Sequence, residues 1–193
     1  MLKAEPLYLI ALLLPDDLAS RVSDIKREFA ERYNCRYALN VVPHITLQEP
    51  FRCAPGKLPD LVNYLEGFSQ YQYSFNLKLE GFGAFNNPEK RVIYINVKSE
   101  KLLSHLHKNL KFLLRTRMHF SEELTRSRYT PHVTVAYRDL DKEAFEKAWP
   151  VFRTRPFSAE FPVNTFCLLK HSGGRWQKLS EFSLAAYQYD LFA

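Results

Sequence analysis

The sequence predicts an α+β fold of two pseudo-symmetric lobes, each a mainly antiparallel sheet flanked by helices, with a cleft between them. Segments typical of strands and helices alternate along the chain, and the same order of elements occurs twice. The motif Pro-His-x-Thr also occurs twice, at His44 and at His132, which are 88 residues apart in a chain of 193. Self-similarity of this kind indicates an internal repeat. We therefore expect one bilobal domain over residues 1–193.

The first half begins with an apolar strand, residues 8–14, that leads directly into a helix. Asp16 is the expected N-cap. Apolar residues then recur at spacings of three and four, as they do along one face of a helix, at Leu18, Val22, Ile25, Phe29 and Tyr33. The remaining elements expected in this half are a motif strand at residues 41–48, a short helix at 58–68 and a hairpin of two strands at 73–85 and 91–97.

The second half repeats this order of elements. Ser99 is the expected cap of a helix whose apolar stripe consists of leucines, at positions 103, 106, 110, 113 and 114. A basic loop, residues 115–130, leads from this helix to the second motif. The remaining elements are a motif strand at residues 131–138, a short helix at 142–149 and a hairpin of two strands at 157–169 and 175–184. This hairpin turns at Gly173 and Gly174.

The two motifs place a histidine and a threonine on one face of each motif strand. Residues i and i+2 of a strand share a face, so His44 lies beside Thr46, while their apolar neighbours point the other way. His132 and Thr134 repeat this arrangement. We expect both pairs to face one cleft.

Two histidines that flank one phosphate can act together as acid and base. Histidine has an unperturbed pKa of about 6.5, so one imidazole can accept a proton from the attacking oxygen while the other donates a proton to the leaving oxygen. Threonine hydroxyls can donate hydrogen bonds to the non-bridging oxygens, where negative charge accumulates. This chemistry requires no metal and no cofactor. A 2′,3′-cyclic phosphate end of RNA suits it, because water can open the strained ring with acid–base assistance.

A single His-x-Thr on a strand is usually structural, but two copies at equivalent places in a repeat favour a catalytic function. The alternative is a non-catalytic module that uses the same cleft to bind an RNA end or a small nucleotide. The sequence contains no GxSxG, P-loop, GxGxxG or HExxH motif. Its three cysteines, Cys35, Cys53 and Cys167, form no CxxC pair, which argues against a disulfide framework or a cysteine zinc site.

Composition is consistent with this hypothesis. The hydrophobic content of 46% suits a globular domain, and the formal charge of +6 suits a polyanionic partner such as RNA. The longest apolar stretch, residues 7–14, is far shorter than the roughly 20 residues that span a membrane. No signal peptide is recognisable, so we expect a cytoplasmic protein with no membrane partner. We also expect a monomer.

The sequences PHITL and PHVTV resemble the paired HxTx motifs of the two-histidine phosphoesterase superfamily. This family includes 2′-5′ RNA ligase-like proteins and RNA 2′,3′-cyclic phosphodiesterases. The resemblance implies a bilobal α+β fold, metal-independent hydrolysis of cyclic phosphates, and the possibility of reverse 2′-5′ ligation. It also implies that His44, Thr46, His132 and Thr134 form the catalytic site. In hydrolysis, His44 would be the proton donor and His132 the acceptor.

Two continuations depart from the pattern of this family. The first motif continues as QEPF, where a Phe-Leu-Gly run is common, and the second as AYRD, so that Tyr137 stands where an arginine is expected. Aromatic residues close to the motifs are candidates for stacking on bases, namely Phe51, Tyr129 and Tyr137. Arg128 is a candidate for contact with phosphate.

Overall fold

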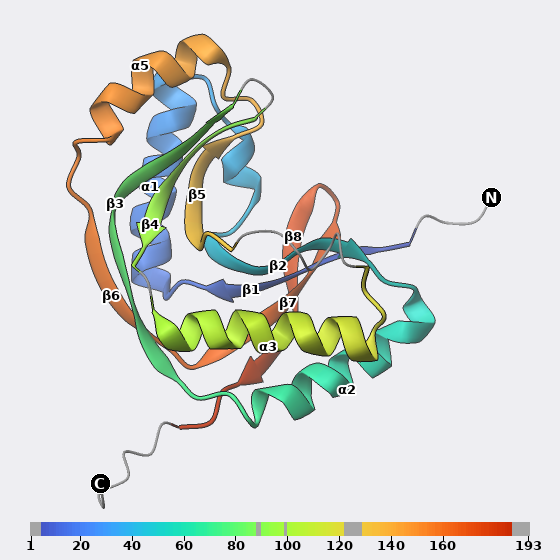
Figure 1. Cartoon of the computed structure of the whole chain (residues 1–193). Coiled ribbons are helices and arrows are strands. Elements are labelled where there is room, and N and C mark those ends of the chain that lie inside the picture. Colours follow the sequence, from blue (N-terminus) through green and yellow to red (C-terminus); the bar gives the residue numbers. More distant parts are fainter. Residues whose placement is uncertain (1–4, 88–89, 99, 122–128, 187–193) are drawn as a thin grey trace, which may run out of the picture.

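The computed structural model describes residues 5–87, 90–98, 100–121 and 129–186. Within these ranges the chain forms two four-stranded antiparallel sheets flanked by helices (Figure 1). The predicted fold class is confirmed. The elements in chain order are β1 (Leu7–Leu13), α1 (Asp16–Arg32), η1 (Tyr37–Asn40), β2 (His44–Arg52), η2 (Pro55–Lys57), α2 (Leu58–Ser69), β3 (Phe75–Asn87), β4 (Lys90–Val97), α3 (Lys101–Arg117), β5 (His132–Tyr137), α5 (Lys142–Phe152), β6 (Ser158–Val163), β7 (Thr165–Ser172) and β8 (Arg175–Ser183).

The two motif strands occupy equivalent places in the two sheets. One sheet has the order β2-β1-β7-β8 and the other the order β5-β4-β3-β6, so β2 and β5 are both edge strands. Each motif strand pairs with the first strand of its own half, β2 with β1 and β5 with β4. The two edges also contact each other, which brings the two motifs to the junction between the sheets.

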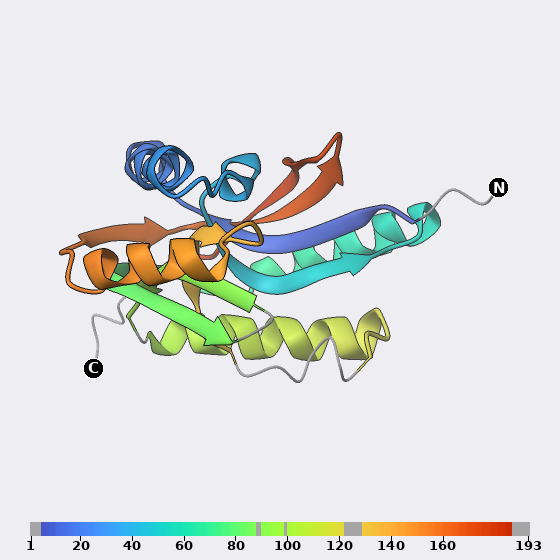
Figure 2. The same ribbon diagram turned by 90° about the horizontal axis from the view of Figure 1, so that it is seen from above.

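The first helix of each half covers the sheet that contains the other motif strand. Helix α1 follows β1 but packs against β5, and α3 follows β4 but packs against β2. Figure 1 shows α1 and α5 beside the β3–β6 sheet, with α2 and α3 side by side against the other sheet. Seen from above in Figure 2, α1 and α3 lie on opposite sides of the molecule. Each motif is therefore supported by residues from both halves of the chain.

The internal repeat extends to the details of the backbone. Helices α1 and α3 both have 17 residues. Two residues after the end of each helix the backbone enters the left-handed region, at Asn34 with φ 52° and at His119 with φ 56°. The next amide then donates to a carbonyl of the last turn, Cys35 N to Phe29 O and Phe120 N to Leu114 O, both at 3.2 Å. In each half of the chain, this helix end turns the backbone toward the motif strand.

The helix caps differ from those predicted. Asp16 is the first residue of α1 rather than its cap, and Pro15 at the cap position makes no side-chain hydrogen bond. Helix α3 is capped by the carboxylate of Glu100, which accepts a hydrogen bond from Leu102 N at 2.9 Å. Ser99 lies outside the described residues. The predicted basic loop also begins later, because α3 continues through Arg117.

The predicted strand at 157–169 is two strands in different sheets. β6 pairs with β3 in one sheet, and after Asn164 the chain enters the other sheet as β7, which pairs with β1. The hairpin of β7 and β8 turns at Gly173 and Gly174, as predicted, with φ angles of 57° and 76° that favour glycine. The crossing after Asn164 joins the two lobes covalently.

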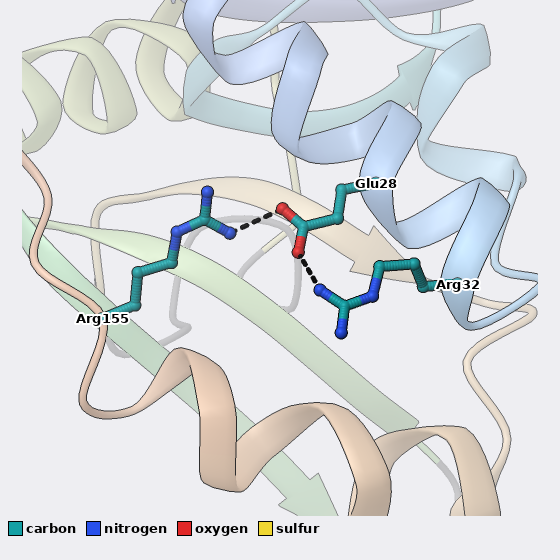
Figure 3. Close-up of polar contacts among 3 residues, drawn as sticks. All are labelled: Glu28, Arg32 and Arg155. Carbon is teal, nitrogen blue, oxygen red and sulfur yellow. Dashed lines mark hydrogen bonds and ion pairs between the residues drawn. The ribbon is translucent and has the colours of Figure 1, made fainter.

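An ion-pair cluster fixes α1 to the segment that follows α5. Figure 3 shows the carboxylate of Glu28 between two guanidinium groups, with Arg155 at 2.6 Å and Arg32 at 2.8 Å. Burial alone raises the pKa of Glu28, but the hydrogen bonds and charges of Arg155 and Arg32 outweigh it and lower that pKa. The cluster thus connects the first half of the chain to the second.

The three cysteines are buried and unpaired, at Cys35, Cys53 and Cys167. No helix in the described ranges is both long enough and apolar enough to cross a bilayer.

Candidate active site

Both motif strands contain a β-bulge immediately after the threonine. In the first sheet Thr46 lies opposite Ala11 and Gln48 lies opposite Ile10, so Leu47 is an extra residue. In the second sheet Thr134 lies opposite Tyr94 and Ala136 lies opposite Ile93, so Val135 is the extra residue. A bulge reverses the alternation of side chains along the strand. The third residue after each threonine therefore lies on the face that carries the histidine and threonine.

The two histidines have the same orientation. His44 Nδ1 lies 2.8 Å from the carbonyl oxygen of Val42, and His132 Nδ1 lies 2.7 Å from that of Thr130. A carbonyl oxygen only accepts, so each Nδ1 carries the proton, and in the neutral ring Nε2 is the basic nitrogen. Both imidazoles are partly exposed. In each imidazole only Nδ1 takes part in the hydrogen bond to the backbone, and Nε2 does not.

The surroundings lower the proton affinity of both imidazoles. Burial is the main cause that lowers the pKa of His44 to about 4; the bond to Val42 opposes it, and the charges of Lys26 and His132 add to the lowering. Burial also lowers the pKa of His132, where Thr130 and Glu49 oppose it and Lys90 adds to it. The effect of His132 on His44 indicates that the two rings lie within electrostatic reach of each other.

Aromatic side chains of β3 and β4 surround His132. The ring of Tyr94 lies 4.9 Å from the imidazole and that of Phe85 lies 5.4 Å away, with 4.7 Å between these two rings. Tyr94 lies opposite Gly83 on β3. A β-carbon at residue 83 would lie 2.5 Å from Tyr94 Cε2, so the glycine makes room for this ring.

The side of the site near His44 is more aliphatic. Ala11 lies opposite Thr46 on β1 and belongs to a small buried cluster with Leu9, Cys167 and Leu169. Leu13, which lies opposite His44, and Trp176 pack against this cluster. The two motifs thus differ in their apolar surroundings, although their hydrogen bonds match.

Glu49 and Tyr137 are the residues that the bulges return to the motif face. Strict alternation would place Gln48 beside Thr46, but Gln48 is fully buried and Glu49 is exposed. The charge of Glu49 raises the pKa of His132, which shows that it acts on the second motif from the first. Tyr137 lies opposite Val92, two residues from Tyr94 on β4. An acidic and an aromatic side chain therefore occupy equivalent positions beside the two motifs.

Among the four residues predicted to bind substrate, Phe51 is placed in the core. It is only 3% exposed and packs against Tyr8 and Phe120, with ring centroids at 6.1 Å and 4.8 Å. Both faces are therefore unavailable to a base, and the prediction for Phe51 is wrong. Residue 51 follows two register shifts of β2, which together leave it on the inward face of Ile45 and Leu47, where strict alternation also places it.

One face of the Tyr129 ring is covered, and its hydroxyl group is buried. Its ring stacks on His107 of α3 at 3.6 Å with an angle of 7° between the planes. Burial raises the pKa of the hydroxyl. Only the other face of this partly exposed ring could contact a base. Arg128 lies outside the described residues.

Tyr137 is part of an aromatic group that holds Arg138. Its ring packs edge-on against Tyr37 at 5.2 Å. The guanidinium of Arg138 lies 4.3 Å from the centre of the Tyr37 ring and donates a hydrogen bond to its hydroxyl. Arg138 is in the left-handed region, with φ 65°. The arginine next to the second motif is thus bound to the η1 segment of the first half.

The buried His107 should make the folded protein less stable in acid. Burial is the main cause that lowers its pKa to about 4. Between about pH 6.5 and 4 the unfolded chain therefore binds a proton that the folded chain does not, and stability is lost as the pH falls through this range. We expect His107→Phe, which keeps the stacking on Tyr129, to reduce that loss by about 2 kcal/mol, measured by denaturant unfolding at pH 7 and pH 4.5.

His105→Gln is the matched control for this measurement, because His105 is exposed on the same helix. It should leave the pH dependence unchanged. An equal change in both variants would mean that His107 does not titrate as its burial requires.

The sequence signal for the supporting residues was weak. Phe85 and Tyr94 read as ordinary strand aromatics, and only the pairing of β3 with β4 and β5 brings them to His132. The position of Glu49 depends on a bulge that sequence periodicity does not reveal. Lys26 reads as a solvent-exposed residue of an amphipathic helix, whereas it is 3% exposed in the structure.

A sequence model of the 2′-5′ RNA ligase superfamily matches residues 14–175. The match covers most of the chain and includes both motifs. The chain belongs to the 2′-5′ RNA ligase superfamily. Membership in this superfamily confirms the family that the paired motifs indicated.

Relatives of this chain align over most of their length. A protein of Geobacillus sp. (strain WCH70), provisionally named a phosphoesterase, is 29% identical over 167 residues, which are 85% of this chain and 90% of the relative. A Bacillus licheniformis protein with the same provisional name is 28% identical over 169 residues, 87% of this chain and 95% of the relative. The chain is thus similar in extent to proteins that carry a phosphoesterase name.

Solved structures share the fold at lower identity. A Thermus thermophilus protein has a TM-score of 0.67 and 20% identity and covers 94% of this chain and 100% of its own. Escherichia coli LigT without ligand has a TM-score of 0.65 and 18% identity, with coverage of 95% and 99%. LigT has also been crystallised with 3′-AMP, with a TM-score of 0.66, 18% identity and the same coverage.

Proposed function

We propose that this protein is a metal-independent phosphodiesterase that opens 2′,3′-cyclic phosphate ends of RNA or related nucleotides. Its catalytic groups are His44, Thr46, His132 and Thr134. Membership in the 2′-5′ RNA ligase superfamily and the phosphoesterase names of its relatives support phosphoester chemistry. The LigT complex with 3′-AMP supports a nucleotide ligand.

The observation that carries this proposal is the matched orientation of the two imidazoles. In each motif a backbone carbonyl binds Nδ1–H, so the two rings offer their Nε2 atoms for proton transfer. Such carbonyl bonds select one tautomer and hold the ring, as a catalytic base and acid require. A pair of structural histidines would not need the same bond in both halves.

The reaction needs one neutral and one protonated imidazole. The neutral ring accepts a proton from water as the water oxygen bonds to phosphorus. One of the two ring P–O bonds breaks, and the protonated imidazole gives its proton to the departing ribose oxygen. The product is a phosphomonoester, and one proton has moved from one histidine to the other through the reaction. When a ribose 5′-hydroxyl takes the place of water with the same histidine roles, ring opening forms a 2′-5′ phosphodiester, which corresponds to ligation. In the reverse direction that linkage is cleaved to the cyclic phosphate, and the histidines exchange roles.

The threonines stabilise the charge on phosphorus during this step. Thr46 and Thr134 lie on the faces of β2 and β5 that carry the histidines, two residues away. Their hydroxyls can donate to the two non-bridging oxygens, which carry more charge in the transition state than in the substrate. Tyr137, where an arginine is expected, supplies no such charge.

A substrate screen tests this proposal. Chelator-treated protein is incubated with the four nucleoside 2′,3′-cyclic monophosphates and with a short RNA that ends in a cyclic phosphate, and the products are separated by chromatography. We expect ring opening without added metal. Turnover that disappears on chelation and returns with a metal ion would refute the metal-independent mechanism.

A non-catalytic binding module is the second candidate function. The position of Tyr137 favours it, because an aromatic residue replaces a phosphate-binding charge and can contact a base instead. Tight binding of the same nucleotides with no turnover at any pH between 5 and 9 would establish this alternative. The same screen therefore distinguishes the two candidates.

A further inference from the structure

Arg138 is an exposed arginine that follows the second motif strand in an unusual backbone conformation. Its φ angle is 65°, and the amide of Asp139 donates to the carbonyl oxygen of Tyr137 at 2.9 Å. A positive φ at the centre of a bond between residues i and i+2 has the form of a γ-turn that is rare and strained. A residue other than glycine keeps such a conformation only where its surroundings enforce it, and such residues cluster at functional sites. The end of β5 therefore calls for a functional explanation.

The turn brings the side chain of Arg138 beside that of Tyr137. Strict alternation along a strand would place residues 137 and 138 on opposite faces of the sheet. Instead, the guanidinium lies 5.8 Å from the centre of the Tyr137 ring and 4.3 Å from that of the Tyr37 ring. It also donates a hydrogen bond to the Tyr37 hydroxyl. Because Tyr137 lies on the motif face, the positive charge of Arg138 is held beside that face.

Asp139 fixes the segment that carries Tyr37. Its carboxylate accepts hydrogen bonds from the backbone amides of Arg36 at 2.7 Å and Tyr37 at 2.9 Å, and from the thiol of Cys35 at 3.0 Å. Movement of Tyr37 away from Arg138 would have to break these bonds. The tyrosine and the guanidinium therefore form a preorganised pair, which lowers the cost of binding a ligand.

The charge of Arg138 is not neutralised by an acidic partner. In the part of the chain that the structure describes, the hydrogen bond to the Tyr37 hydroxyl is the contact that its guanidinium makes with an oxygen. An arginine presents five N–H donors, so most of them stay available in this exposed side chain. A guanidinium that rests on an aromatic ring keeps its charge and its fixed fork geometry, which suits it to a phosphate group.

The order of side chains along β5 matches the order of chemical groups at an RNA end. Thr134 lies with His132 where the cyclic phosphate is proposed to bind, the ring of Tyr137 follows, and the guanidinium of Arg138 comes next. In an RNA that ends in a cyclic phosphate, the terminal nucleoside likewise separates that phosphate from the next phosphodiester. A mononucleotide with a free 5′-hydroxyl has no second phosphate.

We propose that Arg138, held by Tyr37, binds the phosphodiester on the 5′ side of the terminal nucleotide and makes the site selective for RNA ends over mononucleotides. Tyr137 then lies against the nucleoside between the two phosphates. The inference rests on the proposed function and deepens it, because it names the substrate class of the same site.

The test compares two dinucleotides that differ only in the charge of their linkage. Both are adenosine dinucleotides that end in a 3′-phosphate, and they carry either a phosphodiester or an uncharged methylphosphonate linkage. Calorimetry with the unmodified protein at low salt should show about tenfold tighter binding of the phosphodiester, because hydrogen bonds between charged groups are the stronger ones. Added salt should reduce this preference by about 0.7 of a log unit per log unit of salt, the value for one neutralised phosphate on a single strand.

Three variants connect this preference to the arginine. Arg138→Gly removes the side chain and keeps the backbone conformation, since glycine adopts a positive φ without strain, and it should bind both dinucleotides with equal affinity. Tyr37→Phe keeps the ring but loses the hydroxyl that accepts from Arg138, and should lower the preference by about threefold. Arg36→Met is the matched control, because it removes an exposed arginine of the same segment, whose Nε donates to Asn34 Oδ1. It should keep the full preference.

Equal binding of the two dinucleotides by the unmodified protein, or no binding of either, would overturn the inference. A full preference in folded Arg138→Gly, or an equal loss in Arg36→Met, would overturn it as well, because the preference would then come from general charge. The binding measurement needs no turnover. A failed substrate screen together with a preference that depends on Arg138 would therefore refute the proposed reaction and leave this inference standing.

Discussion

His132→Ala is expected to lower kcat/KM for a 2′,3′-cyclic substrate by about 100-fold or more, and His44→Ala by a similar factor. Each substitution removes one of the two proton transfers that the ring opening needs. The double variant should be little worse than either single variant, because the two imidazoles act as one unit in the same step. Steady-state kinetics on the best substrate of the screen measures all three.

The control for these variants is His105→Ala, which removes an exposed histidine of α3 that contacts neither motif. It should retain full activity. In the unmodified protein, kcat/KM should be bell-shaped in pH, with limbs that belong to the coupled pair. Full activity in His132→Ala would falsify the two-histidine mechanism.

Gly83→Ala is expected to destabilise the protein by about 3 kcal/mol, near the upper end for an overpacked site. The new methyl group would lie 2.5 Å from Tyr94 Cε2 and 2.6 Å from Asn96 Oδ1. The tyrosine cannot move away easily, since it is 8% exposed and its ring is in contact with Phe85 and His132. We also expect a loss of activity of tenfold or more, because displacement of Tyr94 disturbs His132. Denaturant unfolding and kinetics measure the two effects.

Gly67→Ala provides the matched control for Gly83→Ala. Gly67 lies in α2 with no atom within 4 Å of the added methyl group. Alanine favours a helix over glycine by about 0.5–1 kcal/mol, so this variant should be slightly more stable than the unmodified protein and equally active. A Gly83→Ala variant that behaves in the same way would show that the Tyr94 ring has room to move.

The sequence alone determined the elements and the pairing of functional side chains within each motif. The spacing of three and four along residues 18–33 predicted α1, and the period of two placed His44 with Thr46 and His132 with Thr134. These inferences succeed because they depend on contacts between residues a few positions apart. The repeat of the motif then indicated two lobes, since two copies of one unit tend to fold in the same way.

The tertiary structure decided how the two halves combine. The exchange of α1 and α3 between the sheets, and the crossing after Asn164, depend on which apolar faces cover one another, and local periodicity carries no information about that. The bulges at Leu47 and Val135 bring Glu49 and Tyr137 to the motif face, against strict alternation. The same long-range packing buries Lys26 against the carbonyl oxygen of Val41, just before β2, because burial is set by the neighbouring element rather than by the helix on which a residue lies.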